Sequence, residues 1–298
     1  MKVSRPDKVL FPDDGITKGE LAAYYERVAQ PMLRHIKGRP ISMQRFPDGI
    51  GKHGFFHKDV PDHFPDWVRR VEVPKKNGTV THALICDART LVYLADQASI
   101  TPHVWLSRAD KLKQPDRLVF DLDPSSGNFA DVRRAARSIG ELVQELGLSP
   151  FAMTTGSRGL HVWIPLRRKA GFDDVRRFAR DLARVMVDRA PEALTLEARK
   201  EKRGGRILID VMRNGYAQTA VPPYAVRARP TAPVATPLRW QELSDSTLRP
   251  DKFTLRNLDR RLARVGDPWA EIARHARGLD RPRKRLSKLL TESERGPS

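Results

Sequence analysis

Two carboxylates stand one residue apart at the end of an apolar stretch, in Arg117-Leu118-Val119-Phe120-Asp121-Leu122-Asp123-Pro124. The apolar residues predict a β-strand, which Pro124 ends. Residues i and i+2 of a strand lie on the same face, so Asp121 and Asp123 are expected side by side, with Cα atoms roughly 7 Å apart. Carboxylates this close repel each other unless a cation lies between them. Magnesium or manganese, held together with substrate phosphates, would fit this position.

The same pair also has a simpler interpretation. An Asp-x-Asp pair before Pro-Ser-Ser-Gly is typical of turns, because Asp side chains accept hydrogen bonds from the N–H groups of turns and of the helices that follow them. The pair alone therefore leaves both a metal site and a turn open.

A third carboxylate lies within another apolar stretch, Ile207-Leu208-Ile209-Asp210-Val211-Met212. An unpaired carboxylate inside a strand is costly, so Asp210 requires either a cation or a neighbouring arginine. Together with Asp121 and Asp123 it completes the carboxylate set used in two-metal phosphoryl transfer, in which two acids bridge both ions and a third holds one of them.

A polar turn lies between two apolar segments, in Thr154-Thr155-Gly156-Ser157-Arg158-Gly159-Leu160-His161. Hydroxyl groups, backbone N–H groups and one arginine in a single turn can surround a polyphosphate. His161, which begins the second segment, is placed to donate a hydrogen bond to a phosphate oxygen. The turn therefore predicts a phosphate-binding site.

Two lysines near the N-terminus form a further candidate phosphate site. Thr17-Lys18-Gly19-Glu20 has the spacing of a capping box, so we expect a helix to begin at Thr17 and its first N–H groups to favour an anion. Lys8 and Lys18 would then hold one phosphate together. Two solvated surface lysines are the alternative.

Phe55 and Phe56 lie between Lys52, His53, His57 and Lys58. Exposed aromatic side chains among cations are typical of proteins that stack on unpaired bases, although one of two adjacent strand residues often faces the core. His103 lies among apolar residues, where it either contacts a ligand or satisfies a buried hydrogen bond.

The elements that must position these residues alternate between strands and helices. We expect strands over 41–46, 54–57, 67–73 and 79–85, and helices over 90–98, 128–146 and 173–189. A last helical pattern runs over 255–276 and is broken near Gly266 and Pro268. Residues 279–298 form a basic tail that we expect to be disordered, whereas residues 1–278 are predicted to be a single catalytic domain. The class is mixed α/β (α+β).

The chain of 298 residues carries 55 Lys and Arg against 36 Asp and Glu, a formal net charge of +19. Such an excess favours a polyanionic partner, most often nucleic acid. The sequence contains no apolar run long enough for a membrane span and no apolar leader, so we expect a cytoplasmic, nucleoid-associated protein without membrane contact. Cys86 is the single cysteine, which excludes an internal disulfide bond.

Three of these segments, in this order, resemble the motifs of the archaeo-eukaryotic primase superfamily: Asp121-Leu122-Asp123-Pro124, Gly156-Ser157-Arg158-Gly159-Leu160-His161 and Ile209-Asp210. Residues 1 to about 278 resemble, more closely, the polymerase domain of bacterial ligase D. Further matching stretches are Asp7-Lys8-Val9-Leu10-Phe11-Pro12, Phe55-Phe56, His103 with Trp105-Leu106-Ser107-Arg108, Gln218-Thr219-Ala220-Val221, Pro223-Tyr224 and Gly266-Asp267-Pro268-Trp269. The sequence has no Lys-x-Asp-Gly ligase motif, so we expect a stand-alone polymerase or an excised domain.

The resemblance implies a primase-type fold with an antiparallel catalytic sheet like that of RNA-recognition motifs, flanked by helices and an N-terminal αβ portion. It implies that Asp121, Asp123 and Asp210 are catalytic and hold two divalent ions, manganese or magnesium. The remaining implied contacts are His103, Thr155, Ser157, Arg158, His161 and Arg227 to the nucleotide, Lys8 and Lys18 to a DNA 5′-phosphate, and Phe55 and Phe56 stacking beside that phosphate.

The function implied is template-directed addition of nucleotides, preferably ribonucleotides, to a primer 3′-hydroxyl at gaps and double-strand breaks in non-homologous end joining. The implied partners are DNA with 5′-phosphate ends or gaps, NTP or dNTP, Ku and an ATP-dependent DNA ligase. Three other functions fit part of the sequence. A primase of the same superfamily would share the acids, a DNA end-binding protein would not need them, and a mononucleotide-processing enzyme would not explain the charge.

Overall fold

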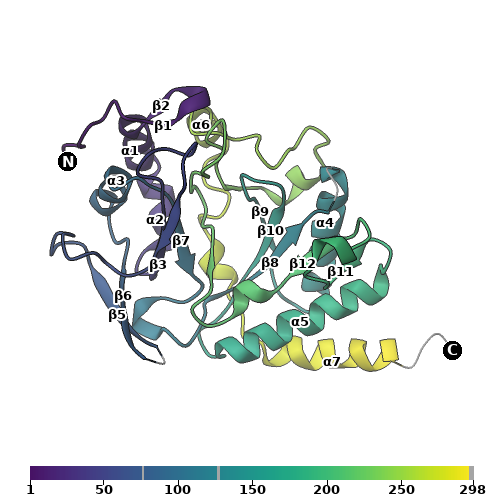
Figure 1. Ribbon diagram of the computed structural model, residues 1–298. Helices are drawn as coiled ribbons and strands as arrows, with labels where there is room; N and C mark the ends of the chain where they lie inside the picture. Colours follow the sequence, from purple (N-terminus) through teal and green to yellow (C-terminus); the bar gives the residue numbers. More distant parts are fainter. Residues whose placement is uncertain (76, 126–127, 295–298) are drawn as a thin grey trace. The chain divides into compact units, whose positions relative to one another are not determined.

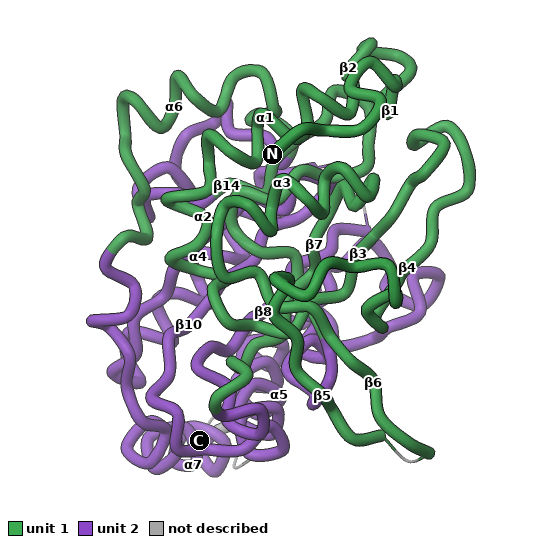
Figure 2. Tube along the Cα trace, turned by 90° about the vertical axis from the view of Figure 1, so that its left-hand side faces the viewer, with its two compact units in different colours: residues 1–110, 219–236, 251–270 green, residues 111–218, 237–250, 271–298 purple. Residues whose placement is uncertain are grey.

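The structure is a computed structural model that describes residues 1–75, 77–125 and 128–294. The chain forms two compact units, each assembled from segments far apart in sequence (Figure 2). Unit 1 comprises residues 1–110, 219–236 and 251–270, and unit 2 comprises residues 111–218, 237–250 and 271 onward. Residues 1–278 contribute to both units because the chain returns to unit 1 twice after residue 218. The assignment of these residues to one catalytic domain stays a prediction.

Unit 1 combines helices with three small sheets (Figure 1). Its largest sheet has the strand order β13-β7-β3-β4, while β1 pairs with β2 and β5 pairs with β6. The elements are β1 (Val9–Phe11), β2 (Ile16–Thr17), α1 (Lys18–Arg27), α2 (Ala29–Ile36), β3 (Ile41–Arg45), β4 (Phe55–His57), β5 (Arg70–Lys75), β6 (Gly78–Ala83), α3 (Ala88–Asp96), β7 (Ser99–Trp105), β13 (Thr219–Ala220) and α6 (Leu258–Val265). The strands and helices expected between residues 41 and 98 are confirmed, with ends shifted by a few residues.

Helix α1 begins where the capping box predicted. Thr17 Oγ1 accepts a hydrogen bond from the Glu20 N–H (3.2 Å), and Glu20 Oε2 accepts one from the Thr17 N–H (2.8 Å). Pro31 lies in the first turn of α2, where a proline costs no intrahelical hydrogen bond. The break expected near Gly266 and Pro268 in the last helical pattern is confirmed, because α6 ends at Val265 and a short 3₁₀ helix, Ile272–His275, follows separately.

A buried polar network in unit 1 anchors the segment 221–235 to the helices. Tyr24 Oη donates to the Tyr224 carbonyl (2.8 Å), and Tyr224 Oη donates to Asp267 Oδ1 (2.7 Å). Asp267 Oδ2 also contacts His35 Nε2 (2.9 Å), and Asp267 Oδ1 accepts the Trp269 N–H (3.0 Å). Burial raises the pKa of Asp267, but these donors outweigh burial and hold its pKa below the usual value of 3.8.

The lowered pKa of Asp267 predicts a pH-dependent contribution to stability. A carboxyl group whose pKa is lower in the folded state stabilises the fold above its unfolded pKa, and this contribution is lost as the pH falls through the folded pKa. Replacing Asp267 by Asn should therefore reduce the free energy of unfolding by about 1–3 kcal/mol at neutral pH, with a smaller difference below about pH 4. Urea titrations at several pH values would measure this, and exposed Asp173→Asn is the control. A difference that grows on acidification would contradict the prediction.

Unit 2 is built around a sheet in which five strands follow the order β11-β12-β8-β10-β9. Strand β8 lies at its centre, antiparallel to both β10 and β12. The elements are β8 (Arg117–Asp123), α4 (Phe129–Glu145), β9 (Phe151–Thr154), β10 (Leu160–Pro165), α5 (Phe172–Arg189), β11 (Leu194–Thr195), β12 (Ile207–Asp210) and α7 (Asp280–Glu294), with β14 (Thr236–Pro237) where the chain passes between the units. This sheet, antiparallel except for the pairing of β11 with β12, and its helices confirm the expected mixed fold.

Alternation along β8 separates its two faces. Leu118, Phe120 and Leu122 are fully buried, and helices α4 and α5 pack on the sheet. Asp121 and Asp123 belong to the opposite face because side chains alternate along a strand. The Pro-Ser-Ser-Gly turn expected after Asp123 includes Ser126 and Gly127, which lie outside the described residues.

The predicted disorder of the C-terminal tail is wrong for residues 280–294, which form α7. Leu286 is 2% exposed, and Arg283 Nη2 forms an ion pair with Asp174 Oδ1 on α5 (3.4 Å). The tail looked too charged to fold, but its apolar residues recur at helical spacing and find a partner in α5. Among the described residues, no helix is long and apolar enough to cross a membrane.

Candidate functional site

Three polar residues form a row across the central strands of unit 2. Asp121 lies directly opposite Asp210 on β12 and directly opposite His161 on β10. Residues directly opposite on paired strands share a face, with Cβ atoms about 5 Å apart. His161 Nε2 lies 3.4 Å from Asp121 Oδ1, and Arg213 Nε lies 3.6 Å from Asp121 Oδ2. The strand register thus brings Asp210, 89 residues away in sequence, beside Asp121.

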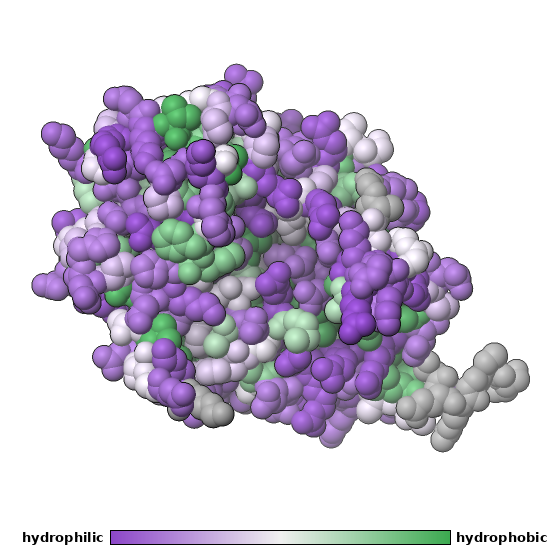
Figure 3. All heavy atoms as spheres, in the orientation of Figure 1, coloured by the Kyte–Doolittle hydropathy of each residue, from purple (hydrophilic) through white to green (hydrophobic). Residues whose placement is uncertain are grey.

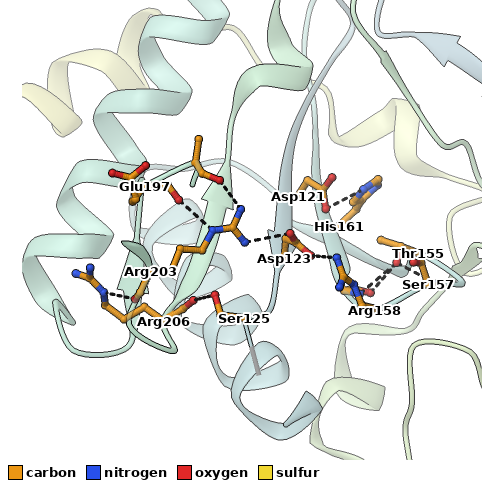
Figure 4. A network of polar contacts seen from close by, with 12 residues as sticks. Asp121, Asp123, Ser125, Thr155, Ser157, Arg158, His161, Glu197, Arg203 and Arg206 are labelled. Atoms are coloured by element: carbon orange, nitrogen blue, oxygen red, sulfur yellow. Dashed lines mark hydrogen bonds and ion pairs between the residues drawn. The ribbon is translucent and has the colours of Figure 1, made fainter. Parts of the chain in front are cut away.

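Asp123, two residues further along β8, lies between two arginines (Figure 4). Arg203 Nη1 is 3.1 Å from Asp123 Oδ2, and Arg158 Nη2 is 3.5 Å from Asp123 Oδ1. The Arg203 side chain is buried and also donates to the carbonyls of Glu197 (3.1 Å) and Ala198 (2.8 Å). These contacts fix Arg203, so its positive charge balances part of the negative charge of the acid pair.

Asp210 is oriented by the turn that follows its strand. Asp210 Oδ1 accepts the Met212 N–H (2.7 Å). In the same turn, the side chain of buried Asn214 exchanges two hydrogen bonds with the backbone of Val119, at 2.9 and 2.7 Å. Asn214 thereby continues the pairing along β8 beyond the end of β12 and holds Asp210 in register with Asp121.

The polar turn between β9 and β10 is closed by one of its own hydroxyl groups. Thr155 Oγ1 donates to the Gly159 carbonyl (3.1 Å) and accepts the N–H groups of Gly159 and Ser157 (both 3.3 Å). Thr155 therefore shapes the turn, while Ser157 and Arg158 are more exposed. Arg158, whose side chain is 56% exposed, is the cation that this turn presents next to the acids.

The acids fit a divalent metal site by their chemistry and placement. Asp121, Asp123 and Asp210 share one face of two paired strands, and oxygen-only carboxylate ligands are those that Mg²⁺ and Mn²⁺ prefer. In the described part of the chain, no three His, Cys, Asp or Glu side chains converge closely enough to form a metal centre. Here the carboxylate oxygens instead contact Arg158, Arg203 and the Met212 N–H.

The predicted stacking residues lie in unit 1, on the edge strand β4. Phe55 is 45% exposed and Phe56 is 55% exposed, so the alternative in which one of them is a core residue is wrong. Both are exposed because β4 is the last strand of its sheet. The Phe56 ring lies 5.2 Å from the ring of His103 on β7, and the Arg45 guanidinium lies 5.7 Å from the Phe55 ring.

The backbone brings Lys8 and Lys18 together, but their ammonium groups have different surroundings. The Lys18 N–H donates to the Lys8 carbonyl (2.8 Å). Lys8 Nζ is 3.2 Å from exposed Asp48, whereas Lys18 is 3% exposed, with Nζ 2.8 Å from both Asp96 Oδ1 and Ser4 Oγ. Burial raises the pKa of Asp96, but the hydrogen bonds from Lys18 and Ser4 together lower this pKa by more than burial raises it. The pKa of Asp96 is therefore below its usual value.

The expectation that the first N–H groups of α1 would be free for an anion is wrong. The Lys18 N–H donates to the Lys8 carbonyl, the Gly19 N–H to the Pro6 carbonyl (2.8 Å), and the Glu20 N–H to Thr17 Oγ1. The capping box and the preceding segment therefore satisfy the groups that a phosphate would otherwise use.

Arg227 lines a cavity of about 450 Å³ in unit 1, together with Gln44 and Arg229. Its position depends on buried hydrogen bonds to β7. Thr101 Oγ1 donates to the Val226 carbonyl (2.6 Å), and Tyr25 Oη donates to the Ile100 carbonyl (2.5 Å) while accepting the Val226 N–H (3.2 Å). The two residues predicted to contact a nucleotide from this unit, His103 and Arg227, are thus held to the same strand.

Sequence reasoning did not identify Arg203 and Arg213, which contact the acids. The signal was present in the basic segment Arg199–Arg206 immediately before β12, but only the structure shows which of its side chains turns inward. Ser125 Oγ donates to the Arg206 carbonyl (2.7 Å) and ties this segment to the end of β8.

An acid row on antiparallel strands, beside an arginine-bearing polar turn and flanked by helices, is the arrangement expected of a nucleotidyl-transferring enzyme of the primase-polymerase class. The chain belongs to the family described as "LigD, primase-polymerase domain", whose sequence model matches residues 17–269. This family comprises nucleotidyltransferase-type polymerases of DNA end joining, and membership implies a metal-dependent polymerase.

Individual relatives agree with this assignment. The chain is 34% identical over 256 residues to the multifunctional non-homologous end joining protein LigD of Mycolicibacterium smegmatis, covering 85% of this chain and 34% of the relative. The corresponding Pseudomonas aeruginosa protein is 33% identical over 276 residues, covering 92% of this chain and 33% of the relative. The chain therefore spans about a third of the length of these relatives.

A solved structure shows the same fold. The polymerase domain from Mycobacterium tuberculosis ligase D in complex with DNA superposes with a TM-score of 0.87 at 32% identity, over 93% of this chain and 99% of that domain. The match over almost the whole domain confirms the fold expected from the sequence.

Proposed function

We propose that this protein adds nucleotides, preferably ribonucleotides, to a primer 3′-hydroxyl at DNA gaps and double-strand break ends, directed by the template strand. The observation that carries this proposal is the row formed by Asp210, Asp121 and His161, with Asp123 and Arg158 beside it. The DNA in the similar solved structure supports DNA as the partner. Ku and an ATP-dependent ligase are the proposed protein partners, because the relatives are end-joining proteins.

Asp121, Asp123 and Asp210 would hold two divalent ions, manganese or magnesium. When bound, such ions neutralise charge on the reacting phosphate and on the leaving pyrophosphate, and increase the reactivity of the attacking hydroxyl. Arg158 binds phosphate oxygens through its guanidinium, and Ser157 and His161 add hydrogen bonds. Thr155 acts through the shape of the turn, since its hydroxyl bonds to Gly159.

Unit 1 carries the other residues proposed to contact DNA or nucleotide. Phe55 and Phe56 expose aromatic faces on which unpaired bases stack, and His103 and Arg227 are the proposed nucleotide contacts. Lys8, whose ion pair is with the exposed carboxylate of Asp48, is proposed to hold the 5′-phosphate. Lys18 would also contact this phosphate, by exchanging its ion pair with Asp96 for one with the phosphate. This exchange costs more free energy than the corresponding one at Lys8, because the Lys18–Asp96 pair is buried.

Primer extension on a gapped duplex tests the proposal. Substrates with and without a 5′-phosphate at the gap, and with ribo- or deoxynucleotides, would be compared in manganese. We expect template-matched extension that is faster with ribonucleotides and stimulated by the 5′-phosphate. The Lys8→Gln variant should lose that stimulation, whereas Lys37→Gln, an exposed lysine on the same unit, should retain it. Binding of the gap without extension in any condition would contradict the proposed activity.

The hydroxyl of Tyr25 should be important for nucleotide affinity, because it links β7 to the segment that carries Arg227. Tyr25→Phe is expected to raise the KM for nucleotide about three- to tenfold with kcat changed less than twofold, consistent with loss of about 1 kcal/mol of binding. Tyr93→Phe is the matched control, since this tyrosine lies on α3 and its ring packs against Phe64 and Trp67, away from the segment that carries Arg227. Steady-state kinetics below the melting temperature of both variants would measure the effect. Equal increases in KM for the two would indicate general loosening and contradict the specific role.

A further inference from the structure

A set of exposed cations lies on helices α5 and α7, away from the acids. The two helices pack against each other within unit 2 and lie side by side in Figure 1. We define the basic face by its six exposed side chains, Arg177, Arg180 and Arg184 on α5 and Arg281, Lys284 and Lys288 on α7. Figure 3, drawn in the same orientation, shows hydrophilic side chains gathered over this lower edge.

These cations are poorly neutralised. Arg184 has Asp181 at 3.8 Å, but the other five form no ion pair with a carboxylate of the described residues. Asp174 on α5 forms its ion pair with Arg283 on α7, and Arg283 is not one of the six residues that define the basic face. The positive charge of the face is therefore available to a partner.

The face continues into the loops from which both helices start. The Arg167 N–H donates to the Arg277 carbonyl (2.9 Å), and the Arg277 N–H donates to the Pro165 carbonyl (3.4 Å). Both Arg167 and Arg277 are exposed, as is Lys169. The loops before the two helices therefore add three exposed cations at one end of the basic face, next to the exposed carboxylates Asp173 and Asp280 in the first helical turns.

The loops at the start of this surface lie at the opposite end of the central strands from the acids. Pro165, beside these loops, pairs with Arg117 at the opposite end of β8 from Asp123. Along this extended strand, Asp121 of the acid row is four residues from Arg117, about 13 Å, and Asp123 is six residues away, about 20 Å. A group bound to the acids therefore does not account for the basic face.

We propose that the basic face is a second binding surface for duplex DNA, which contacts the phosphate backbone without reading sequence. Three cations on each helix span seven residues, about 10.5 Å at 1.5 Å per residue. This length matches about three base-pair steps of a duplex, since the phosphates of one strand recur every ~3.4 Å along the duplex axis. The positions on one helix recur at i, i+3 and i+7, so they point in the same direction. The proposal goes beyond polymerase activity and does not depend on it.

A quadruple variant tests the proposal: Arg177→Gln, Arg180→Gln, Lys284→Gln and Lys288→Gln. Its matched control removes the same charge from exposed positions of unit 1: Arg34→Gln, Lys37→Gln, Arg260→Gln and Arg264→Gln. Affinity for a fluorescent blunt duplex of about 40 base pairs would be measured from about 50 to 200 mM salt, the range in which phosphate contacts dominate affinity.

For the face variant, we expect binding weaker by roughly 10- to 100-fold at ~100 mM salt and a salt slope smaller by up to about 3.6, since each phosphate contact contributes about 0.9. The control should change the slope by less than about 1. Duplex DNA should also protect Lys284 and Lys288 from acetylation, while Lys37 stays reactive.

Two results would overturn the proposal: an equal loss of affinity in both quadruple variants, which would indicate a general effect of charge, or no protection of Lys284 and Lys288. Extension of a primer at saturating DNA should be unchanged within about twofold in the face variant. If the wild type fails to extend a primer but the face variant still loses its salt slope, the proposed activity fails while the basic face stands.

Discussion

Replacing Asp121 and Asp123 together by Asn is expected to slow primer extension about a thousandfold or more. Asn keeps the size of each side chain but removes the negative charge that a divalent cation requires. Metal-ion stabilisation of a phosphoryl transfer is worth several kcal/mol, and each ~1.4 kcal/mol corresponds to a tenfold change in rate. Single-turnover extension on a gapped duplex would measure the loss separately from product release.

DNA binding provides the control for this variant. Because two negative charges are removed from a proposed DNA site, affinity for the gapped duplex should stay equal or increase. Asp173→Asn, an exposed carboxylate on α5, should extend primers like the wild type. Extension within tenfold of the wild type in the double variant would show that these acids are not the catalytic centre. A non-catalytic DNA end-binding protein would then fit the chain better.

Gly159→Ala is expected to have the second-largest effect, through the position of the polar turn. A Cβ atom at residue 159 would lie 2.0 Å from the carbonyl oxygen of Leu122 on β8, which is backbone and cannot rotate away. The turn must therefore move away from β8 next to Asp123. Overpacking of this kind costs about 1–3 kcal/mol and more against rigid backbone, so thermal unfolding should occur several degrees lower.

Activity should fall further than stability in this variant. Displacement of the turn moves Arg158 and His161 relative to the acids, and a shift of about 1 Å near a reacting centre costs on the order of a hundredfold in rate. Extension would be measured well below the melting temperature of the variant. Gly278→Ala is the matched control, because its nearest neighbour lies at 3.9 Å and the change should be nearly neutral. Wild-type activity and stability in Gly159→Ala would contradict the close packing of turn and strand.

Local features of the chain could be predicted from the sequence because they depend on residues that are close together in it. The capping box at Thr17, the strand ending at Asp123 and helices α4 and α5 follow from spacing and from hydrogen bonds within a few residues. For Phe55 and Phe56, the sequence predicted an exposed aromatic side chain but left open whether one of the two was buried. Adjacent strand residues face opposite ways, and only the place of β4 at the sheet edge leaves both uncovered.

Lys18 and the C-terminal helix show why other features were misread. The N-terminus of α1 looked like an anion site, but its N–H groups and the Lys18 ammonium are satisfied by Pro6, Lys8 and Asp96. The tail looked disordered by charge, yet α7 folds because Leu286 is buried in unit 2. In both cases the deciding partner comes from a part of the chain that composition does not reveal.

The sequence by itself determined the acid pair, the polar turn, the mixed α/β class and the family, since these depend on residue types at short spacing. Only the tertiary structure decided that Asp210 lies opposite Asp121 and that Arg203 and Arg158 flank Asp123. It also decided that the chain forms two units whose segments alternate along the sequence. The reason is physical. Strand register and burial are set by packing between distant segments, and a shift of register by one residue would turn Asp210 to the opposite face.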